Sequence, residues 1–524
     1  MFVKRGRSGA APVGNRPIAL RGSSARLALA IAVAAAVLAV PGIASAEVPF
    51  PEVPSDGWDV NGDVFAVKVV GSTVYVGGTF TEARGPGGNP GLPRSNLAAF
   101  DMDTGGVLPF APDPNGVVRA IESDGSTVWI GGNFNAVGGL SRQNVAAIDS
   151  STGAVETDFD ISNNGPVYGL SLGNDRLYAA GFFTVIEGVV QQRVASLDPA
   201  SGAPDPAFQA GADSPAQALA VSREGRLFAG GRFTSIGGRS DEYLAELDPL
   251  TGAAVGPGFS DVIAPLLDVA VTPDGSRVFG AVAGFQNRAS AWSGFTGDRL
   301  WYHRAMGDTQ AVGYHDGILY FGFHEGFGGD TSVRLLAADV FTGELEGFRP
   351  TMNSFFGVWA IDASPAGLVP VGEFTMVSGV PTRGLAVFPG SGLTPDTTPP
   401  TAPAGITSSA PAGSAVVLQW QAAHDSRGVG HYRVYRDGSH IGSTFEPSYA
   451  DATAAEDTNY TYQILAVDLA GNQSPLSAPV EIRTWRNLVA AGDEWSYTDD
   501  PQGDSWRAAG FDDTSWPSGA AEFG

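Results

Sequence analysis

The chain has 524 residues, of which 71 are glycine, 36 are proline and only 16% are charged. Its 55 acidic residues against 30 basic ones disfavour binding to nucleic acid or anionic lipid, and the lack of cysteine excludes disulfides, zinc–thiolate sites and cysteine nucleophiles. The length indicates two to four domains, and the composition favours short strands joined by tight turns.

The first 46 residues have the features of a signal peptide. Six basic residues accompany an apolar run at 27–46 that ends in Ala-Ser-Ala, which favours cleavage after Ala46 over an uncleaved membrane anchor. The mature chain would keep 24 basic and 55 acidic residues, a net charge of −31. We therefore expect a secreted extracellular protein, either free or associated with a cell surface, with no further membrane span.

One short phrase recurs along the next 350 residues. Its copies read VYVGGTF (74–80), VWIGGNFNAVGG (128–139), LYAAGFFTVIEG (177–188), LFAGGRFTSIGG (227–238) and LVPVGEFTMVSG (368–379). A second phrase, D-x-x-T-G or a relative of it, follows and ends in a turn glycine. These glycines are Gly105, Gly153, Gly202, Gly252, Gly297, Gly343 and Gly392. The seven copies are spaced by 45 to 50 residues, a period typical of a propeller or a solenoid.

Each repeat divides into four short strands. In the second repeat they are expected at 117–123, 126–132, 144–150 and 153–159, joined by turns rich in Asp and Gly. Four antiparallel strands per period form one propeller blade, so the sequence predicts a seven-bladed β-propeller over 47–392. A solenoid is the alternative, but its parallel coils do not require a hairpin turn in every repeat.

The repeat also indicates how the ring closes and what the phrase does. The segment 48–62 resembles the fourth strand of a repeat and is expected to pair as the outer strand of the last blade. The Gly-Gly pair would let backbones approach closely. Five phenylalanines of the phrase would pack between blades: Phe80, Phe134, Phe183, Phe233 and Phe374. This interpretation as scaffold is favoured over a binding role for the phrase itself.

These repeats resemble the secreted bacterial delta-60 repeat type of propeller. The resemblance is close in repeats one to four, and repeats five and six lack the G-G-x-F phrase. That family is defined by its fold and supplies no catalytic residues. Loops between the second and third strands crowd one face of a propeller and are candidates for binding. In the longest loop, 81–96, the candidate ligand-binding residues are Arg84, Asn89 and Arg94.

A Pro/Thr-rich linker at 393–402 precedes a new pattern of alternating strands, which indicates a β-sandwich at 403–485. The residues resemble a bacterial fibronectin type III domain. The resemblance places Trp420 in the core of the second strand, turns Tyr432 and Val434 of the third strand to the core, and gives Tyr460 the tyrosine-corner position. It implies a spacer or binding module without an active site.

The last segment, 486–524, is dense in aromatic residues and resembles the opening of a galactose-binding-like jelly roll. A complete domain of this kind needs about a hundred more residues to bury a core. We therefore interpret the sequence as a fragment of a longer protein, with a truncated jelly-roll segment at its end.

The remaining candidates for chemistry are isolated. His315, His324 and Glu325 fall in one repeat, but their spacing fits no known metal-ligand pattern, so ordinary surface histidines are favoured. Two Asp pairs could bind calcium: Asp101 and Asp103, and Asp512 and Asp513. A turn-closing role is favoured for the D-x-x-T-G aspartates, because they recur in almost every repeat. No hydrolase, metalloprotease or phosphate-loop motif is found, and a sialidase constellation cannot be assembled.

Two functions follow from these observations. The first is a non-catalytic recognition or adhesion protein whose propeller binds carbohydrate or an extracellular, cell-surface protein partner. The alternative is the accessory portion of an extracellular hydrolase, acting in polysaccharide degradation or as a metallophosphoesterase, whose catalytic part lies outside the sequence. No catalytic residues, metal ligands or cofactor are assigned, with calcium as an alternative ligand, and a monomer is expected.

Overall fold

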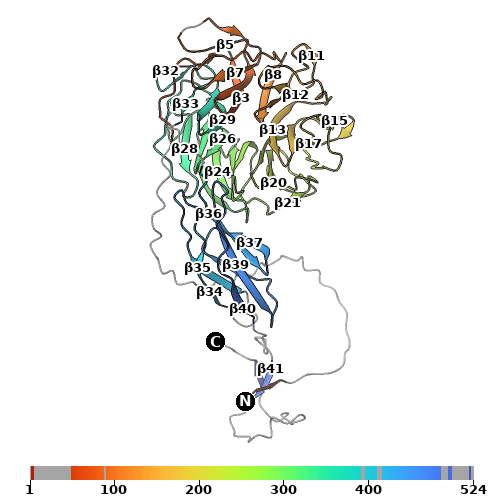
Figure 1. Cartoon of the computed structure of the whole chain (residues 1–524), viewed down its shortest axis with the longest axis vertical. Helices are drawn as coiled ribbons and strands as arrows, with labels where there is room; N and C mark the ends of the chain where they lie inside the picture. The colour runs from red at the N-terminus through yellow and green to blue at the C-terminus, as the bar shows by residue number, and fades with distance from the viewer. Residues whose placement is uncertain are drawn as a thin grey trace.

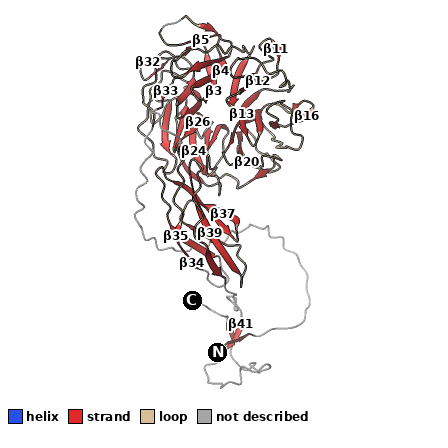
Figure 2. Ribbon diagram, viewed as in Figure 1, coloured by secondary structure: helices blue, strands red, loops and turns tan. Residues whose placement is uncertain are grey.

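A computed structural model describes residues 2–4, 49–87, 90–390, 396–409, 416–484, 494–497 and 518–520. The regular secondary structure of these residues is all strand (Figure 2), and they contain no helix long and apolar enough to cross a membrane. The predicted all-β fold class is confirmed, with a propeller followed by a β-sandwich (Figure 1). The predicted signal peptide and jelly-roll segment lie outside the described residues, except for one small sheet of β1 (Phe2–Lys4), β41 (Glu494–Tyr497) and β42 (Ser518–Ala520).

Seven antiparallel sheets, one per repeat, make up the propeller. In chain order they are β3 (Asp63–Val70), β4 (Thr73–Thr79) and β7 (Leu97–Asp101); β8 (Val117–Ser123), β9 (Thr127–Asn133) and β12 (Val145–Asp149); β13 (Val167–Gly173), β14 (Arg176–Gly181) and β17 (Val194–Leu197); β18 (Ala216–Val221), β19 (Leu227–Gly231), β20 (Leu244–Leu247) and β21 (Ala254–Val255); β22 (Leu266–Val271), β23 (Arg277–Val282), β24 (Arg288–Ser293) and β25 (Arg299–Arg304); β26 (Thr309–His315), β27 (Ile318–Phe323) and β28 (Leu335–Asp339); and β29 (Val358–Ser364), β30 (Gly367–Gly372) and β33 (Phe388–Pro389).

The first strand of each sheet is the innermost. β3, β8, β13, β18, β22, β26 and β29 each contact the next, and β29 contacts β3. This closed circle distinguishes the fold from a solenoid and places seven parallel inner strands around a central channel. Short additional strands form four small sheets outside the seven main ones. They are β2 (Asp59–Val60), β5 (Glu82–Arg84) and β6 (Leu92–Pro93); β10 (Ala136–Val137) and β11 (Leu140–Ser141); β15 (Val185–Ile186) and β16 (Val189–Val190); and β31 (Met376–Val377) and β32 (Val380–Pro381).

The expectation of four strands in every repeat is wrong for most sheets. Among the described residues, a fourth strand forms only in the sheets that contain β21 and β25. In four other sheets it shrinks to one bridge, such as Ile148 with Val155. The chain then leaves the sheet edge and carries a phenylalanine inward to the core. These phenylalanines, all at most 3% exposed, are Phe110, Phe159, Phe208 and Phe348. Burial of an aromatic side chain is worth more than a few hydrogen bonds at a solvated edge.

The segment that was expected to form the outer strand of the last blade does lie against that blade. Ser55 N donates to Val387 O at 2.7 Å, and Thr382 Oγ1 donates to Trp58 O at 2.7 Å. Phe50 packs in the core cluster of the last two sheets. No continuous outer strand forms, however: Asp59 makes only an isolated parallel bridge to Arg383, and Pro49, Pro51 and Pro54 lack the N–H that a ladder needs.

The core lies between the sheets, as the scaffold interpretation predicted. Phe80, Phe134, Phe183, Phe233 and Phe374 are at most 5% exposed. Each belongs to a hydrophobic cluster that combines residues of two adjacent sheets. One such side chain contributes about 1.5–3 kcal/mol by burial, so each copy of the phrase fastens one blade to its neighbour.

The β-sandwich consists of a three-stranded and a four-stranded sheet. The strands are β34 (Ala404–Ser409), β35 (Val416–Gln421) and β38 (Ser448–Asp451), and β37 (Ser439–Thr444), β36 (Val429–Arg436), β39 (Asn459–Asp468) and β40 (Val480–Arg483). Trp420, Tyr432 and Val434 are buried in its core, as predicted. The hydroxyl of Tyr460 accepts a hydrogen bond from Ala455 N at 2.9 Å, a backbone contact typical of a tyrosine corner.

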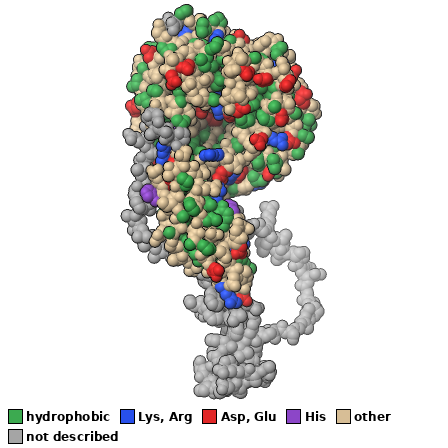
Figure 3. All heavy atoms as spheres, viewed as in Figure 1, with side chains coloured by type: hydrophobic (Ala, Val, Ile, Leu, Met, Phe, Trp, Pro, Cys, Tyr) green, Lys and Arg blue, Asp and Glu red, His purple; other side chains and the backbone are tan. Residues whose placement is uncertain are grey.

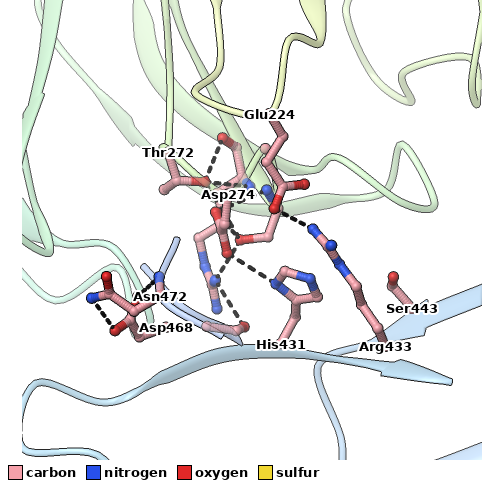
Figure 4. A network of polar contacts seen from close by, with 12 residues as sticks. Glu224, Thr272, Asp274, His431, Arg433, Ser443, Asp468 and Asn472 are labelled. Carbon is pink, nitrogen blue, oxygen red and sulfur yellow. Dashed lines mark hydrogen bonds and ion pairs between the residues drawn. The ribbon is translucent and has the colours of Figure 1, made fainter. Parts of the chain in front are cut away.

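The sandwich packs against the propeller through β36. His431 and Arg433, which alternate with the core residues, point to the turns that follow the inner strands of two sheets (Figure 4). His431 Nδ1 lies 3.0 Å from Asp274 Oδ2, and both side chains are at most 1% exposed. Arg433 forms an ion pair with Glu224. This buried contact makes the sandwich a docked domain, where the resemblance implied a spacer or binding module.

Candidate functional site

The innermost strands share an irregularity near their start. In all seven pairs formed with the second strand, the register shifts by one residue, as between Val64 and Ala66 in β3. Such a β-bulge leaves one residue unpaired and re-aims its side chain. The seven bulge residues, here called the bulge ring, are Phe65, Arg119, Tyr168, Gln217, Leu267, Gln310 and Trp359.

In five of the seven sheets a glycine at the second position of the repeated pair faces the bulge, whereas Val282 and Phe323 hold this position in the fifth and sixth sheets. A Cβ on the second glycine of the pair at Gly132 would lie 2.0 Å from Val117 O, so only glycine tolerates the bulged inner strand there. The first glycine serves the next blade instead. A Cβ on Gly131 would lie 2.6 Å from Val167 Cγ1 of the adjacent sheet. The phrase is therefore scaffold, as predicted, and its glycines accommodate the bulges in the sheets that contain them.

The bulge ring lines a cavity of about 260 Å³ in the central channel, at the end where the inner strands begin. All seven inner strands contribute to its wall. Figure 3 shows a hollow near the middle of the propeller. The loops between second and third strands lie at this same end, here called the mouth face. The sandwich contacts the turns at the other end of the inner strands, here called the sandwich face.

Aromatic side chains form a continuous arc over the mouth face. Trp359 contacts Phe65 at a ring-centroid distance of 5.7 Å and stacks on Phe356 at 5.8 Å, and Phe356 contacts Phe355 at 5.1 Å. Phe355 and Phe356 are 56% and 43% exposed and adjoin each other, and contiguous exposed rings are a feature of surfaces that bind a partner.

Arg119 joins this arc to a second group of rings. Its guanidinium carbon lies 4.7 Å from the ring centroid of Phe65 and 5.1 Å from that of Tyr168. Tyr168 in turn contacts Phe182, which is 41% exposed, at 5.1 Å. Rings and guanidinium together form a platform from the last sheet to the third. Aromatic faces carry partial negative charge, so they attract cations and the polarised C–H groups of sugars.

Charged groups line the channel beyond the bulge ring. Asp268 occupies a position where the other inner strands carry Ala or Gly, and its carboxylate accepts hydrogen bonds from Val269 N at 2.9 Å and Val312 N at 3.0 Å. Burial raises the pKa of Asp268 to about 7. Further in, Lys68 Nζ lies 2.6 Å from Glu122 Oε1. The channel therefore combines an aromatic rim with a polar interior.

A second cavity, of about 450 Å³, opens on the mouth face between the second and third sheets. Its wall is rich in side-chain amides. These are Asn115, Asn133, Asn135, Gln143, Asn144, Asn163 and Asn164. Asn115 and Asn164 brace loops through hydrogen bonds with Asn135 and Thr184. Asn163 is 7% exposed, and its Nδ2 has no acceptor among the described residues.

The predicted binding residues of the 81–96 loop have separate environments. Arg84 is exposed in β5 and forms an ion pair with Glu82. Arg94 is 8% exposed and donates to Pro93 O and Leu108 O, both at 2.7 Å. Arg142 makes the same contacts in the next sheet, which indicates a bracing role for this position. Asn89 lies outside the described residues, and a binding role for the loop stays a prediction.

The candidate metal ligands do not assemble. His315 lies at the end of β26 beside Phe50, whereas His324 follows β27 on the mouth face, next to Phe355 and Phe356. The D-x-x-T-G aspartates close turns, as expected. Asp149, for example, accepts hydrogen bonds from Ser151 and Thr152, which lower its pKa to about 2. Asp512 and Asp513 lie outside the described residues.

Sequence reasoning missed the bulge ring, although a signal exists. Within V-x-x-I and its variants, the residue after the first Val differs in kind from repeat to repeat, as in Phe65, Arg119 and Trp359. Its neighbours are apolar in every repeat except at Asp268 and Thr309. A position that varies inside an otherwise constant structural repeat is one that the scaffold does not constrain. Such a position is free to serve binding.

No family profile matches the chain. Part of it is similar to an exoglucanase and two chitinases: 39% identical over 106 residues to exoglucanase B of Cellulomonas fimi, 40% over 91 residues to chitinase Chi52 of Paenibacillus xylanexedens, and 32% over 144 residues to chitinase A1 of Niallia circulans. These matches cover 20%, 17% and 27% of the chain, and 10%, 17% and 19% of the three enzymes. The chain thus matches less than a fifth of the length of each relative.

Solved structures with a similar fold include the WD40 β-propeller domain of Doa1, with a TM-score of 0.45 and 11% identity over 64% of this chain and 96% of that one. A chain of a mitotic checkpoint complex matches with a TM-score of 0.46 and 16% identity, over 69% of this chain and 99% of that one.

Proposed function

We propose that the chain is a secreted carbohydrate-recognition protein that binds its ligand on the mouth face of the propeller. The observation that carries this proposal is the aromatic arc that includes Phe65, Phe356 and Trp359 beside an open cavity. A sugar ring presents an apolar C–H face and hydroxyl edges. Stacked aromatic faces suit the first, and the amides and carboxyls nearby suit the second.

The organisation along the chain is part of the same proposal. It comprises a signal peptide (1–46), a propeller of delta-60 type with seven blades (47–392), a linker (393–402), a fibronectin type III domain (403–485) and the start of a galactose-binding-like domain (486–524). The repeat period and the turn glycines support the propeller assignment, and the tyrosine-corner contact of Tyr460 supports the sandwich assignment.

Titration of the full secreted chain with a panel of plant, fungal and bacterial oligosaccharides tests the proposal. Trp359→Leu is the informative variant, because Leu267 holds the equivalent bulge position in another blade and shows that the scaffold accepts leucine there. Loss of one stacking face should weaken binding about tenfold, or about 1.4 kcal/mol. Leu250→Ala, in an exposed turn on the sandwich face, is the control and should bind like the wild type.

Two results would contradict the proposal. The first is the absence of binding to any glycan of the panel at millimolar concentration. The second is glycan binding that Trp359→Leu leaves unchanged, since the ligand would then lie elsewhere on the chain.

A second function, the accessory portion of an extracellular hydrolase, is supported by the similarity to exoglucanase B and the chitinases. In that role the mouth face would hold a polysaccharide near a catalytic domain carried elsewhere in a longer protein. Isolation of the mature protein from culture medium, followed by mass measurement and assay on chitin and cellulose, distinguishes the two. A secreted product of no more than 524 residues that lacks hydrolase activity favours recognition alone.

A further inference from the structure

Arg119 is the single cation of the bulge ring, and its side chain contacts aromatic rings. Two aromatic rings flank its guanidinium, at 4.7 and 5.1 Å. Among the described residues, no carboxylate forms an ion pair with it and no acceptor takes a hydrogen bond from it. Several other arginines of the propeller form ion pairs, as Arg176 does with Asp205 at 2.9 Å and Arg226 with Glu246 at 2.7 Å, and Arg94 donates to backbone carbonyls.

The geometry points to a ligand carboxylate as the partner of Arg119, and we infer that the mouth face selects acidic sugars, such as uronic acid residues, over neutral ones. This inference rests on the proposed function and names its ligand class. The guanidinium carbon lies over both rings, and no described residue accepts a hydrogen bond from its N–H groups, which can therefore bind a planar acceptor. A carboxylate can accept two such N–H groups side by side, which a hydroxyl cannot.

The neighbouring side chains fit the remainder of an acidic sugar. Trp359 contacts Phe65, which itself covers one face of Arg119, so an aromatic surface for the sugar ring adjoins the cation that would bind its carboxylate. On the other side, Gln217 lines the same cavity; its Oε1 accepts a hydrogen bond from Arg232, and its amide N–H groups can bind hydroxyl groups. A ligand held by stacking and by one charged contact is therefore accommodated within a single ring of residues.

The overall charge of the protein acts against this preference at long range. A mature chain with a net charge of −31 repels polyanions, but the Debye length at physiological ionic strength is about 8 Å, so the repulsion is largely screened beyond the first contacts. The contact with Arg119 inside the cavity is shielded less. We therefore expect selection at the site without a general affinity for polyanions.

Oligogalacturonides, glucuronate-containing oligosaccharides and their methyl esters are suitable probes, because the ester removes the charge and keeps the sugar ring. The wild-type chain is expected to bind the best acid at least tenfold more tightly than its ester, and Arg119→Gln is expected to bind both equally. Glutamine occupies the equivalent bulge position twice, as Gln217 and Gln310, so the variant should fold, which its melting temperature will verify. Arg119→Lys keeps the charge and should retain part of the preference.

The outcomes separate this inference from the proposed function. Equal binding of acid and ester by the wild-type chain, or an acid preference that survives in Arg119→Gln, overturns the role of Arg119, while binding that depends on Trp359 keeps carbohydrate recognition intact. Failure of acids, esters and neutral glycans alike to bind overturns both. The comparison of acid with ester in the wild-type chain needs no variant and stays decisive if Arg119→Gln does not fold.

Discussion

The two faces of the propeller use the same chemistry with different outcomes. On the sandwich face, the guanidinium of Arg277 lies between Phe341, at 4.7 Å, and Phe445 of the sandwich, at 4.5 Å. On the mouth face, Arg119 lies between Phe65 and Tyr168 at similar distances. Arg277 is 6% exposed and donates to Gly430 O of the docked domain at 3.4 Å, whereas Arg119 has no acceptor among the described residues.

Arg277 therefore illustrates what an arginine between aromatic rings does when its partner is present. On the sandwich face, docking pairs the charges of the turns, as in Asp274 with His431 and Glu224 with Arg433. On the mouth face, rings such as Phe355 remain 56% exposed. The first face is therefore covered by the docked sandwich, whereas the second exposes aromatic rings beside an arginine.

The largest expected effect is loss of the contact between the sandwich and the propeller. Asp274→Ala leaves His431 buried at the interface without its ionic partner, and the loss of one partner of a buried pair costs about 3 kcal/mol of unfolding free energy. We expect the sandwich to undock, which small-angle scattering will detect as a larger radius of gyration. Glu224→Ala, on the same face but in a pair whose side chains are 18% and 26% exposed, should cost less than about 1 kcal/mol.

The docked state should also become less stable at low pH. Burial opposes ionisation of Asp274, but the hydrogen bond and charge of His431 outweigh it and hold the pKa of Asp274 below 3.8. The stability that this carboxylate contributes is therefore present above pH 3.8 and is lost as pH falls through its lower folded-state pKa. Undocking of the wild type already at pH 6, with Asp274→Ala showing the same profile, would contradict this assignment.

The second prediction concerns a glycine that supports the bulge ring at the mouth face. Gly132→Ala places a Cβ 2.0 Å from Val117 O, so the inner strand must shift or lose its bulge, at a cost of about 1–3 kcal/mol. Because Val117 precedes the bulge that carries Arg119 by only two residues, glycan affinity should fall as well. Gly347→Ala is the control, since its Cβ would meet nothing within 4 Å and its backbone is not left-handed. Unchanged affinity in a destabilised Gly132→Ala protein would separate the bulge from binding.

The sequence predicted the scaffold well because the scaffold repeats. Glycines and phenylalanines that recur every 45 to 50 residues, such as Gly132 and Phe134, fixed the number of sheets and the place of the core. The fourth strands were overpredicted, because periodicity does not show that Phe159 leaves the sheet edge to be buried. The docked sandwich depends on His431 and Asp274, which are 157 residues apart and carry no local signal.

The candidate site was harder to predict for a related reason. A residue such as Trp359 is a single aromatic in one strand, and only closure of the ring brings it within 5.7 Å of Phe65 near the other end of the propeller sequence. The loop with Arg84 drew attention in the sequence because it is long and polar. The length of this loop can be read from the sequence, whereas the bulge ring forms only when the propeller closes.

The smallest expected effect is the contribution of Asp268, inside the channel, to the pH dependence of stability. Burial raises the pKa of Asp268 from 3.8 to about 7, so the folded protein holds a proton there that the unfolded chain releases. Unfolding free energy should therefore fall as pH rises from about 4 to about 7, by on the order of 1 kcal/mol after allowance for water in the channel. Asp268→Ala, which restores the alanine that five other inner strands carry, should remove this decline in denaturation curves recorded across that range.

Asp149, whose pKa is lowered where that of Asp268 is raised, provides the control. Hydrogen bonds from Ser151 and Thr152 lower the pKa of Asp149 to about 2, so its contribution is present above pH 3.8 and lost as pH falls toward 2. Asp149→Ala should flatten the profile only on the acid side, whereas Asp268→Ala flattens it between pH 4 and 7. If both variants changed the unfolding free energy in the same pH range, Asp268 would not be the origin of its decline between pH 4 and 7. The carboxylate of Asp268 would then be ionised throughout that range in the channel below the mouth face.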